Sequence, residues 1–203
     1  MDSSLTGGGT LIDNGVHLLD LVRWLTGEEF IEAQGSVTYN LDISATQSDG
    51  TRVFKKPSQC EDNAFGVFKS KSGCTAILHS SWVQWQGYLY LEIFGTNGLL
   101  VVNNDQTQGQ VSYNVFSRHG DPPKNITEVP ACLRPDPSWK LQLQEFAAAI
   151  REDREPSPNG YDGLQSLRLV DAVYMSAKTG QAVSIKTELP SPRKELSRAS
   201  AVA

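Results

Sequence analysis

Three polar side chains recur along one short stretch of the chain: Asp13, His17 and Asp20. On an α-helix that turns by about 100° per residue from Leu11, they fall near 200°, 240° and 180°, with Trp24 near 220°. Asp13 and His17 are four residues apart, so their side chains can meet on successive turns. An imidazole titrates near neutrality, and a nearby carboxylate favours and orients its protonated form. The pair is therefore suited to proton transfer, for example from the hydroxyl of an alcohol during oxidation.

The remaining directions around this predicted helix are aliphatic. They are occupied by Ile12, Val16, Leu18, Leu19, Leu21, Val22 and Leu25. An unpaired charge in a core is costly, so the polar stripe must face a polar cavity or satisfy itself. Structural interpretations stay open: Asp13 has capping-box spacing from Thr10, His17 could be a hydrogen-bonded core histidine, and Asp20 could be a surface residue or a partner of Arg23. Three ligands at these spacings on one helix splay too far for compact metal coordination, so we expect no metal site.

The stretch with these residues is predicted to be a helix over residues 10–26, which Gly27 ends. Residues 31–40 alternate in part and are predicted to form a strand, whereas the polar residues 41–61 are predicted to form a long loop. Further strand-like runs, separated by turn residues, cover residues 63–70, 74–83, 88–94, 99–103, 110–117 and 126–129. Because most connections between them are short, we expect antiparallel pairing.

After the prolines around residue 137, the apolar period changes to that of a helix, about 3.6 residues. A helix is predicted to begin with Ser138 as its N-cap, and a second over residues 162–179 is ended by Gly180. Residues 183–186 are predicted to add an edge strand. This order of elements predicts an α+β fold, in which an open, mostly antiparallel sheet is covered by helices on one face.

The composition is that of a globular protein, and the length of 203 residues suits one large domain or two small ones. We expect one domain over residues 1–187 and a polar, disordered tail over residues 188–203. The net charge of −5, without a cluster of Lys or Arg, argues against a nucleic-acid partner. No apolar stretch is long enough to span a bilayer and no signal peptide is recognised, so no membrane partner is expected. The three cysteines lack disulfide or zinc spacing, and we expect a cytoplasmic protein with reduced thiols.

The glycines before the predicted helix, Gly7, Gly8 and Gly9, do not match a dinucleotide-binding turn. Such a turn follows a strand and has GxGxxG spacing, and neither feature is present. We interpret the glycines as a segment that lets the chain pack tightly against the sheet.

Residues 7–20 (GGGTLIDNGVHLLD) and 24–27 (WLTG) closely resemble a pattern of the glucose-fructose oxidoreductase/inositol dehydrogenase family. That pattern reads GGG-x-L-x-D-x-G-x-H-x-x-D-x-x-x-W-L-x-G. Residues 93–100 resemble the strand-turn-strand of the family, and residues 162–183 resemble its closing helix. The resemblance spans residues 6–187 and identifies the chain as similar to the C-terminal domain of the family.

The resemblance implies a substrate-side α+β domain that works with a Rossmann domain binding NAD or NADP, supplied in cis or in trans. The family's D-x-x-x-H pair falls on Asp13 and His17, which implies that His17 accepts the proton in alcohol oxidation and that Asp13 orients it. Substrates in the family are mostly sugars, polyols and their derivatives. Its catalytic lysine, in an E-K-P motif, precedes the glycine run, whereas Lys56-Pro57 follows the pair. We therefore expect no cofactor binding and no turnover by this chain alone.

Other residues offer weaker candidates for binding. Trp82 and Trp85 bracket a predicted turn, where they could stack on a sugar ring or pack over the sheet edge. His79 could line a pocket or a subunit contact if it points to the open face, or be a hydrogen-bonded strand histidine. Apolar residues on that face predict a homo-oligomer. The alternative function is a non-enzymatic binding, regulatory or oligomerisation module on the same scaffold.

Overall fold

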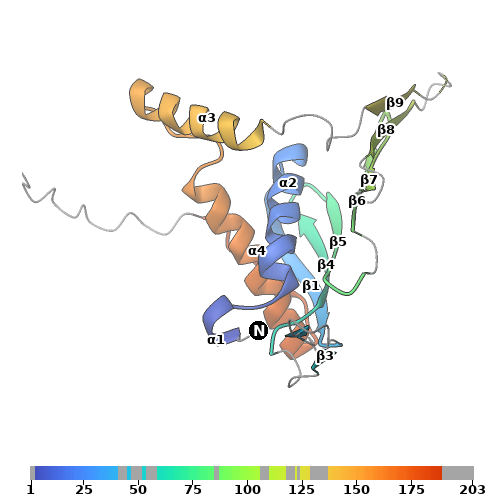
Figure 1. Ribbon diagram of the computed structural model, residues 1–203, viewed down its shortest axis with the longest axis vertical. Coiled ribbons are helices and arrows are strands. Elements are labelled where there is room, and N and C mark those ends of the chain that lie inside the picture. The colour runs from blue at the N-terminus through green and yellow to red at the C-terminus, as the bar shows by residue number, and fades with distance from the viewer. Residues whose placement is uncertain are drawn as a thin grey trace, which may run out of the picture. The chain divides into compact units, whose positions relative to one another are not determined.

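The computed structural model describes residues 3–40, 45–46, 52–53, 59–84, 87–105, 110–117, 122, 124–128 and 137–188. The chain divides into two compact units, one made of Met1–Val83 with Pro158–Ala203 and the other of Gln84–Ser157. The fold is α+β with open antiparallel sheets, which confirms the predicted class (Figure 1). The strands are divided among separate sheets, where we had expected one. The predicted end of the domain at residue 187 stays a prediction, and residues 189–203 lie outside the described part.

The first unit contains a four-stranded antiparallel sheet with the order β10-β1-β4-β5. Its strands are β1 (Phe30–Thr38), β4 (Asn63–Ser70), β5 (Thr75–Ser81) and β10 (Val183–Ser184). Buried and exposed residues alternate along β4, as period-two side-chain directions require. The short β10 lies at the edge beside β1, where the sequence predicted an edge strand.

One face of this sheet is covered by helices. Figure 1 shows α2 (Val16–Thr26) and α4 (Gly160–Thr179) side by side over it. The core joins strand and helix residues: Leu11, Leu19, Phe30, Ala33, Ala64, Phe68, Leu78, Leu169, Val170, Ala172, Val173 and Ile185. Gly35 lets α4 approach, because a Cβ there would lie 2.9 Å from Val173 Cγ1. The opposite face has no such cover among the described residues, and Phe65, Val67 and Ile77 on it are exposed.

Both helices end where the sequence predicted. Gly27 and Gly180 adopt left-handed backbone conformations, with φ of 67° and 71°, and each donates its N–H to the carbonyl four residues earlier. Left-handed geometry favours glycine because it has no Cβ. The start of α4 is a complete capping box between Asn159 and Asp162, so the helix begins two residues before the predicted boundary.

The second unit contains a four-stranded antiparallel meander. It consists of β6 (Tyr88–Gly95), β7 (Gly98–Asp105), β8 (Gln110–Ser117) and β9 (Lys124–Glu128), and α3 (Ser138–Glu152) follows. The predicted N-cap of α3 is wrong: Pro137 occupies that position and makes no side-chain cap.

Three short elements were not predicted. They are α1 (Ser3–Thr6), β2 (Ala45–Thr46) and β3 (Arg52–Val53), and the last two pair with each other inside the segment predicted as a loop. In the described ranges, no helix is long and apolar enough to cross a membrane.

Candidate active site

The helix that carries Asp13 and His17 is not α-helical throughout. Its first part, η1 (Leu11–Gly15), is a π-helix in which the N–H of Val16 donates to the carbonyl of Leu11, five residues back. The α-helical wheel that predicted adjacent side chains therefore does not hold across this turn. Hydrophobic periodicity cannot reveal one inserted residue, which is why the prediction missed it. Single π turns inside helices frequently occur at functional sites.

Asp13 and His17 are both exposed, whereas Leu11, Gly15 and Leu19 on the same helix are buried. His17 is thus not a core histidine. Asp13 is not part of a capping box either, because Thr10 makes no side-chain cap and its hydroxyl instead bonds Ser80 Oγ at 2.9 Å. Within the described ranges, no hydrogen bond or ion pair joins Asp13 to His17. The structure places both residues on the exposed side of one helix.

A buried glutamate satisfies the start of this helix. Glu61, 2% exposed, accepts the N–H of Gly9 on Oε2 at 2.7 Å and the N–H of Leu11 on Oε1 at 3.0 Å. Its backbone carbonyl accepts the N–H of Thr10 at 3.0 Å. The first N–H groups of a helix have no partner within it, so Glu61 supplies acceptors for three of them in a row.

The glycine run does not fit a dinucleotide. A pyrophosphate bound at a helix start needs free N–H groups, and Glu61 already occupies those of Gly9 and its two successors. There is also no free space, because a Cβ on Gly9 would overlap the Glu61 carbonyl and one on Gly8 would overlap Tyr174 Oη. The glycines serve close packing, as the sequence suggested.

Tyr174 of α4 donates its hydroxyl hydrogen to Glu61 Oε1 at 2.8 Å. Burial, followed by this hydrogen bond and the negative charge of Glu61, raises the pKa of Tyr174 well above its ordinary value. Backbone N–H groups of Gly9 and Ile12 oppose that rise but do not cancel it. Tyr174 therefore stays a neutral donor and links the start of the helix to α4.

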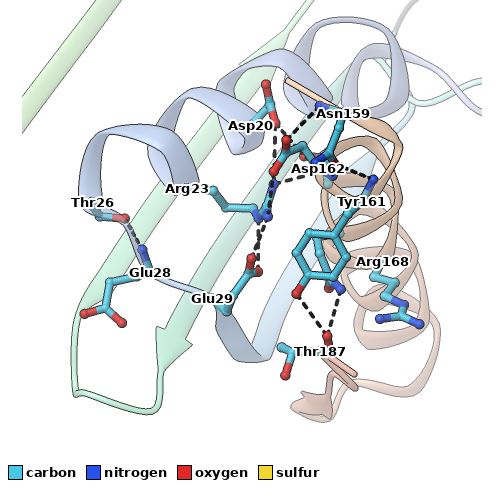
Figure 2. A network of polar contacts seen from close by, with 12 residues as sticks. Asp20, Arg23, Thr26, Glu28, Glu29, Asn159, Tyr161, Asp162, Arg168 and Thr187 are labelled. Atoms are coloured by element: carbon cyan, nitrogen blue, oxygen red, sulfur yellow. Dashed lines mark hydrogen bonds and ion pairs between the residues drawn. The ribbon is translucent and has the colours of Figure 1, made fainter. Parts of the chain in front are cut away.

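The third residue of the polar stripe belongs to a different cluster, drawn in Figure 2. Asp20 accepts hydrogen bonds from Arg23 Nη1 at 3.5 Å and Ser166 Oγ at 3.3 Å. Arg23, whose side chain is 6% exposed, also binds Glu29 and Asp162. Asp20 pairs with Arg23, one of the interpretations left open for it, and its side chain is 40% exposed. This cluster fastens α2 to α4.

The weaker candidates are spread over the sheet. Trp82 directly follows β5 and is partly buried. Its backbone N–H donates to the backbone carbonyl of Asp62 at 2.8 Å. Trp85 lies outside the described residues. His79 is exposed, because its strand neighbours Leu78 and Ser80 face the helix that begins at η1.

The ring of His79 stacks on Phe65 with centroids 4.4 Å apart, and its Nε2 lies 3.3 Å from Asn63 Oδ1. The structure therefore does not bring His79 together with His17, since the two lie on opposite faces of the sheet.

Sequence reasoning missed Glu61 and Tyr174. Glu61 was assigned to the end of a polar loop, and no local signal distinguishes a buried carboxylate there from a solvated one. Its proximity to the start of β4 at Asn63 was the only available hint.

Comparisons with known proteins agree with this architecture. Residues 2–185 match the family model "Oxidoreductase family, C-terminal alpha/beta domain". The chain is 30% identical over 183 residues to the 1,5-anhydro-D-fructose reductase of Ensifer adhaerens, covering 90% of this chain and 49% of that protein. It is 26% identical to the inositol 2-dehydrogenase of Rhizobium meliloti, covering 88% and 50%.

Among solved structures, levoglucosan dehydrogenase in complex with NADH and levoglucosan aligns with a TM-score of 0.71 at 22% identity, a likeness of fold. It covers 88% of this chain and 51% of that one, so the chain spans about half the length of the relatives it matches. The family match covers nearly the whole chain. The chain belongs to this family, as a C-terminal alpha/beta domain of the oxidoreductases.

Proposed function

We propose that the chain is the substrate-side domain of an NAD(P)-dependent oxidoreductase that acts on a sugar, a polyol or a related alcohol. The observation that carries the proposal is the exposure of Asp13 and His17 on a helix whose other side is buried. The names of the relatives, among them an inositol dehydrogenase and a sugar-derivative reductase, support the substrate class.

The proposal assigns to this chain the proton half of the reaction. His17 takes the proton of the substrate hydroxyl while the carbon gives up a hydride and the alcohol becomes a carbonyl, and it returns the proton in the reverse direction. A nicotinamide, when bound, would supply the acceptor for that hydride. Asp13 favours and orients the protonated imidazole. The nicotinamide would be held by a separate nucleotide-binding domain, since the glycine run here does not fit it.

Two further assignments belong to the proposal. Trp82, partly buried at the end of β5, supplies an aromatic surface for a sugar ring, and we propose the same role for Trp85. The open face of the first sheet, with Phe65, Ile77 and His79, forms a contact between copies of the chain. Size-exclusion chromatography with light scattering tests the second assignment. If the I77D variant is a monomer where the wild type is an oligomer, the assignment is supported. If I77D forms the same oligomer as the wild type, the assignment is contradicted.

The chemical assignment is tested by supplying a nucleotide-binding domain of a relative, fused or in trans, and screening sugars and polyols for nicotinamide reduction. H17A should lower kcat by about 10²- to 10⁴-fold, the range for a lost general base. D13N should lower it less, and D171N, which changes an exposed aspartate of α4, should leave it unchanged. A reconstituted enzyme that H17A does not slow would contradict the assignment.

The second candidate function is a non-enzymatic binding module, which is favoured by the absence, in the described ranges, of a hydrogen bond or ion pair between Asp13 and His17. It predicts that the reconstituted protein binds a sugar by calorimetry, with unchanged affinity in H17A, while no nicotinamide is reduced.

A further inference from the structure

Glu61 is a buried carboxylate whose contacts within the described ranges are to neutral donors. These donors are the N–H groups of Gly9 and Leu11 and the hydroxyl of Tyr174. A buried charge is costly unless hydrogen bonds replace its hydration. Both carboxylate oxygens are engaged, and the partial positive charge of the helix start adds a favourable field. This residue is far more constrained than the end of a polar loop would be.

The backbone groups that Glu61 holds define the turn carrying Asp13. Gly9, held by Oε2, accepts the N–H of Asp13 on its carbonyl at 3.1 Å. Leu11, held by Oε1, accepts the N–H of Val16 on its carbonyl and so closes the π turn. The two oxygens of one side chain thus hold Gly9, whose carbonyl accepts the N–H of Asp13, and Leu11, whose carbonyl accepts the N–H of Val16.

We infer that Glu61 is a positioning residue: it holds the π turn Leu11–Gly15 and thereby sets the placement of Asp13 relative to His17. A π turn is rare compared with an α turn, so it persists where surrounding contacts determine it. Packing contributes as well, because a Cβ on Gly15 would lie 2.9 Å from Leu11 Cδ1. Glu61, however, provides the charged hydrogen bonds. The inference rests on the proposed function only in calling Asp13 and His17 the pair that is positioned.

The test compares E61Q with Y174F in the full chain. A glutamine has one acceptor oxygen, so E61Q must lose one of the two bonds from Gly9 and Leu11. Y174F removes a single hydroxyl and leaves both bonds, which makes it the matched control. L169A, a cavity in the core on α4, reports the effect of general destabilisation.

Amide hydrogen exchange by NMR is the first readout. In E61Q, exchange at Leu11, Asp13 and Val16 should be faster by about tenfold or more, as expected for a lost hydrogen bond to a charged group. Amides of β4 should change much less. Y174F should leave the turn protected, and L169A should affect the turn and β4 alike. Equal acceleration of turn and strand in E61Q, or a loss in Y174F that matches E61Q, would overturn the inference.

Turnover of the enzyme reconstituted with a relative's nucleotide-binding domain is the second readout, and it separates the two proposals. With Glu61 present, D13N should lower kcat more than it changes KM, since it removes the carboxylate proposed to orient His17. In the E61Q background, the same D13N change should have at most half that effect on the logarithm of kcat. If D13N leaves kcat unchanged while Glu61 is present, the proposed pair fails, whereas the exchange data still decide whether Glu61 holds the turn.

Discussion

Two arginines, one in each unit, make the same bond in different surroundings. Arg23 donates to both oxygens of Glu29 at 2.6 and 3.1 Å, and Arg154 donates to both oxygens of Glu145 at 2.6 and 3.0 Å. The Arg23 side chain is 6% exposed and that of Arg154 is 40% exposed. With the geometry of these bonds nearly matched, the two clusters differ in the burial of the arginine and in the number of paired carboxylates, three for Arg23 and two for Arg154.

The pKa values of the two clusters do not rank their contributions to stability. The bond from Arg154 lowers the pKa of Glu145 to about 2, although both side chains remain open to solvent. Burial alone would lower the pKa of Arg23, but the hydrogen bond to Glu29 and nearby carboxylate charges raise it above its ordinary value. Solvent and salt screen the exposed pair, so its large shift does not measure folding energy. The buried cluster, which joins α2 to α4 in Figure 2, should matter more.

The largest expected effect comes from R23M, which removes the charge and puts an unbranched apolar side chain in its place. We expect a loss of about 3 kcal/mol in the free energy of unfolding, because three carboxylates are left near one another. Urea unfolding followed by circular dichroism measures this loss. R23K restores the charge without the two-pronged bond to Glu29, so it should recover only part of it. A loss in R23M no greater than in R154M would remove burial as the deciding variable.

The hydroxyl of Tyr174, a largely buried neutral group, allows the effect of burial to be tested at high pH. Burial, then the hydrogen bond and charge of Glu61, raise the pKa of Tyr174, so folding favours its protonated form. Its contribution is fully present below the unfolded value of about 10 and is lost as pH rises from there towards the folded value. The free energy of unfolding of the wild type, minus that of Y174F, should therefore fall between pH 10 and 11.5. A difference that stays constant across this range would contradict the raised pKa.

Much of the fold could be predicted because its signals are local. The strands Asn63–Ser70 and Gln110–Ser117 lie where alternation and turn residues predicted them. The ends of α2 and α4 follow from glycines that can adopt positive φ at Gly27 and Gly180. The pairing of Asp20 with Arg23 could be named as an alternative because the two are three residues apart on one helix.

The rest depends on contacts between distant parts of the chain. Glu61 bonds Leu11 across 50 positions, and Tyr174 reaches Glu61 across 113. Periodicity could not predict either contact, nor the π turn that they accompany. The residues of the proposed pair could therefore be named from the sequence, whereas the π turn that carries Asp13 could not.

The smallest expected effect comes from R154M and E145Q in the exposed cluster. Each should leave the urea midpoint within error of the wild type at neutral pH, because water and salt replace much of the lost attraction. The lowered pKa of Glu145 still predicts a local consequence with a definite sign. Its contribution is present above the ordinary value of about 4.5 and is lost as pH falls from there towards about 2.

Amide exchange at Ser157, whose N–H donates to Glu145 Oε1 at 3.2 Å, reports that local contribution. Over this acidic range, protection of the Ser157 amide should decrease in the wild type, after correction for the intrinsic pH dependence of exchange. In E145Q, which cannot titrate, protection should be low and independent of pH. If R154M instead lowers the free energy of unfolding as much as R23M does, the exposed bond contributes as much to stability as the buried one. Differences in solvent screening between the two arginine clusters would then be unimportant.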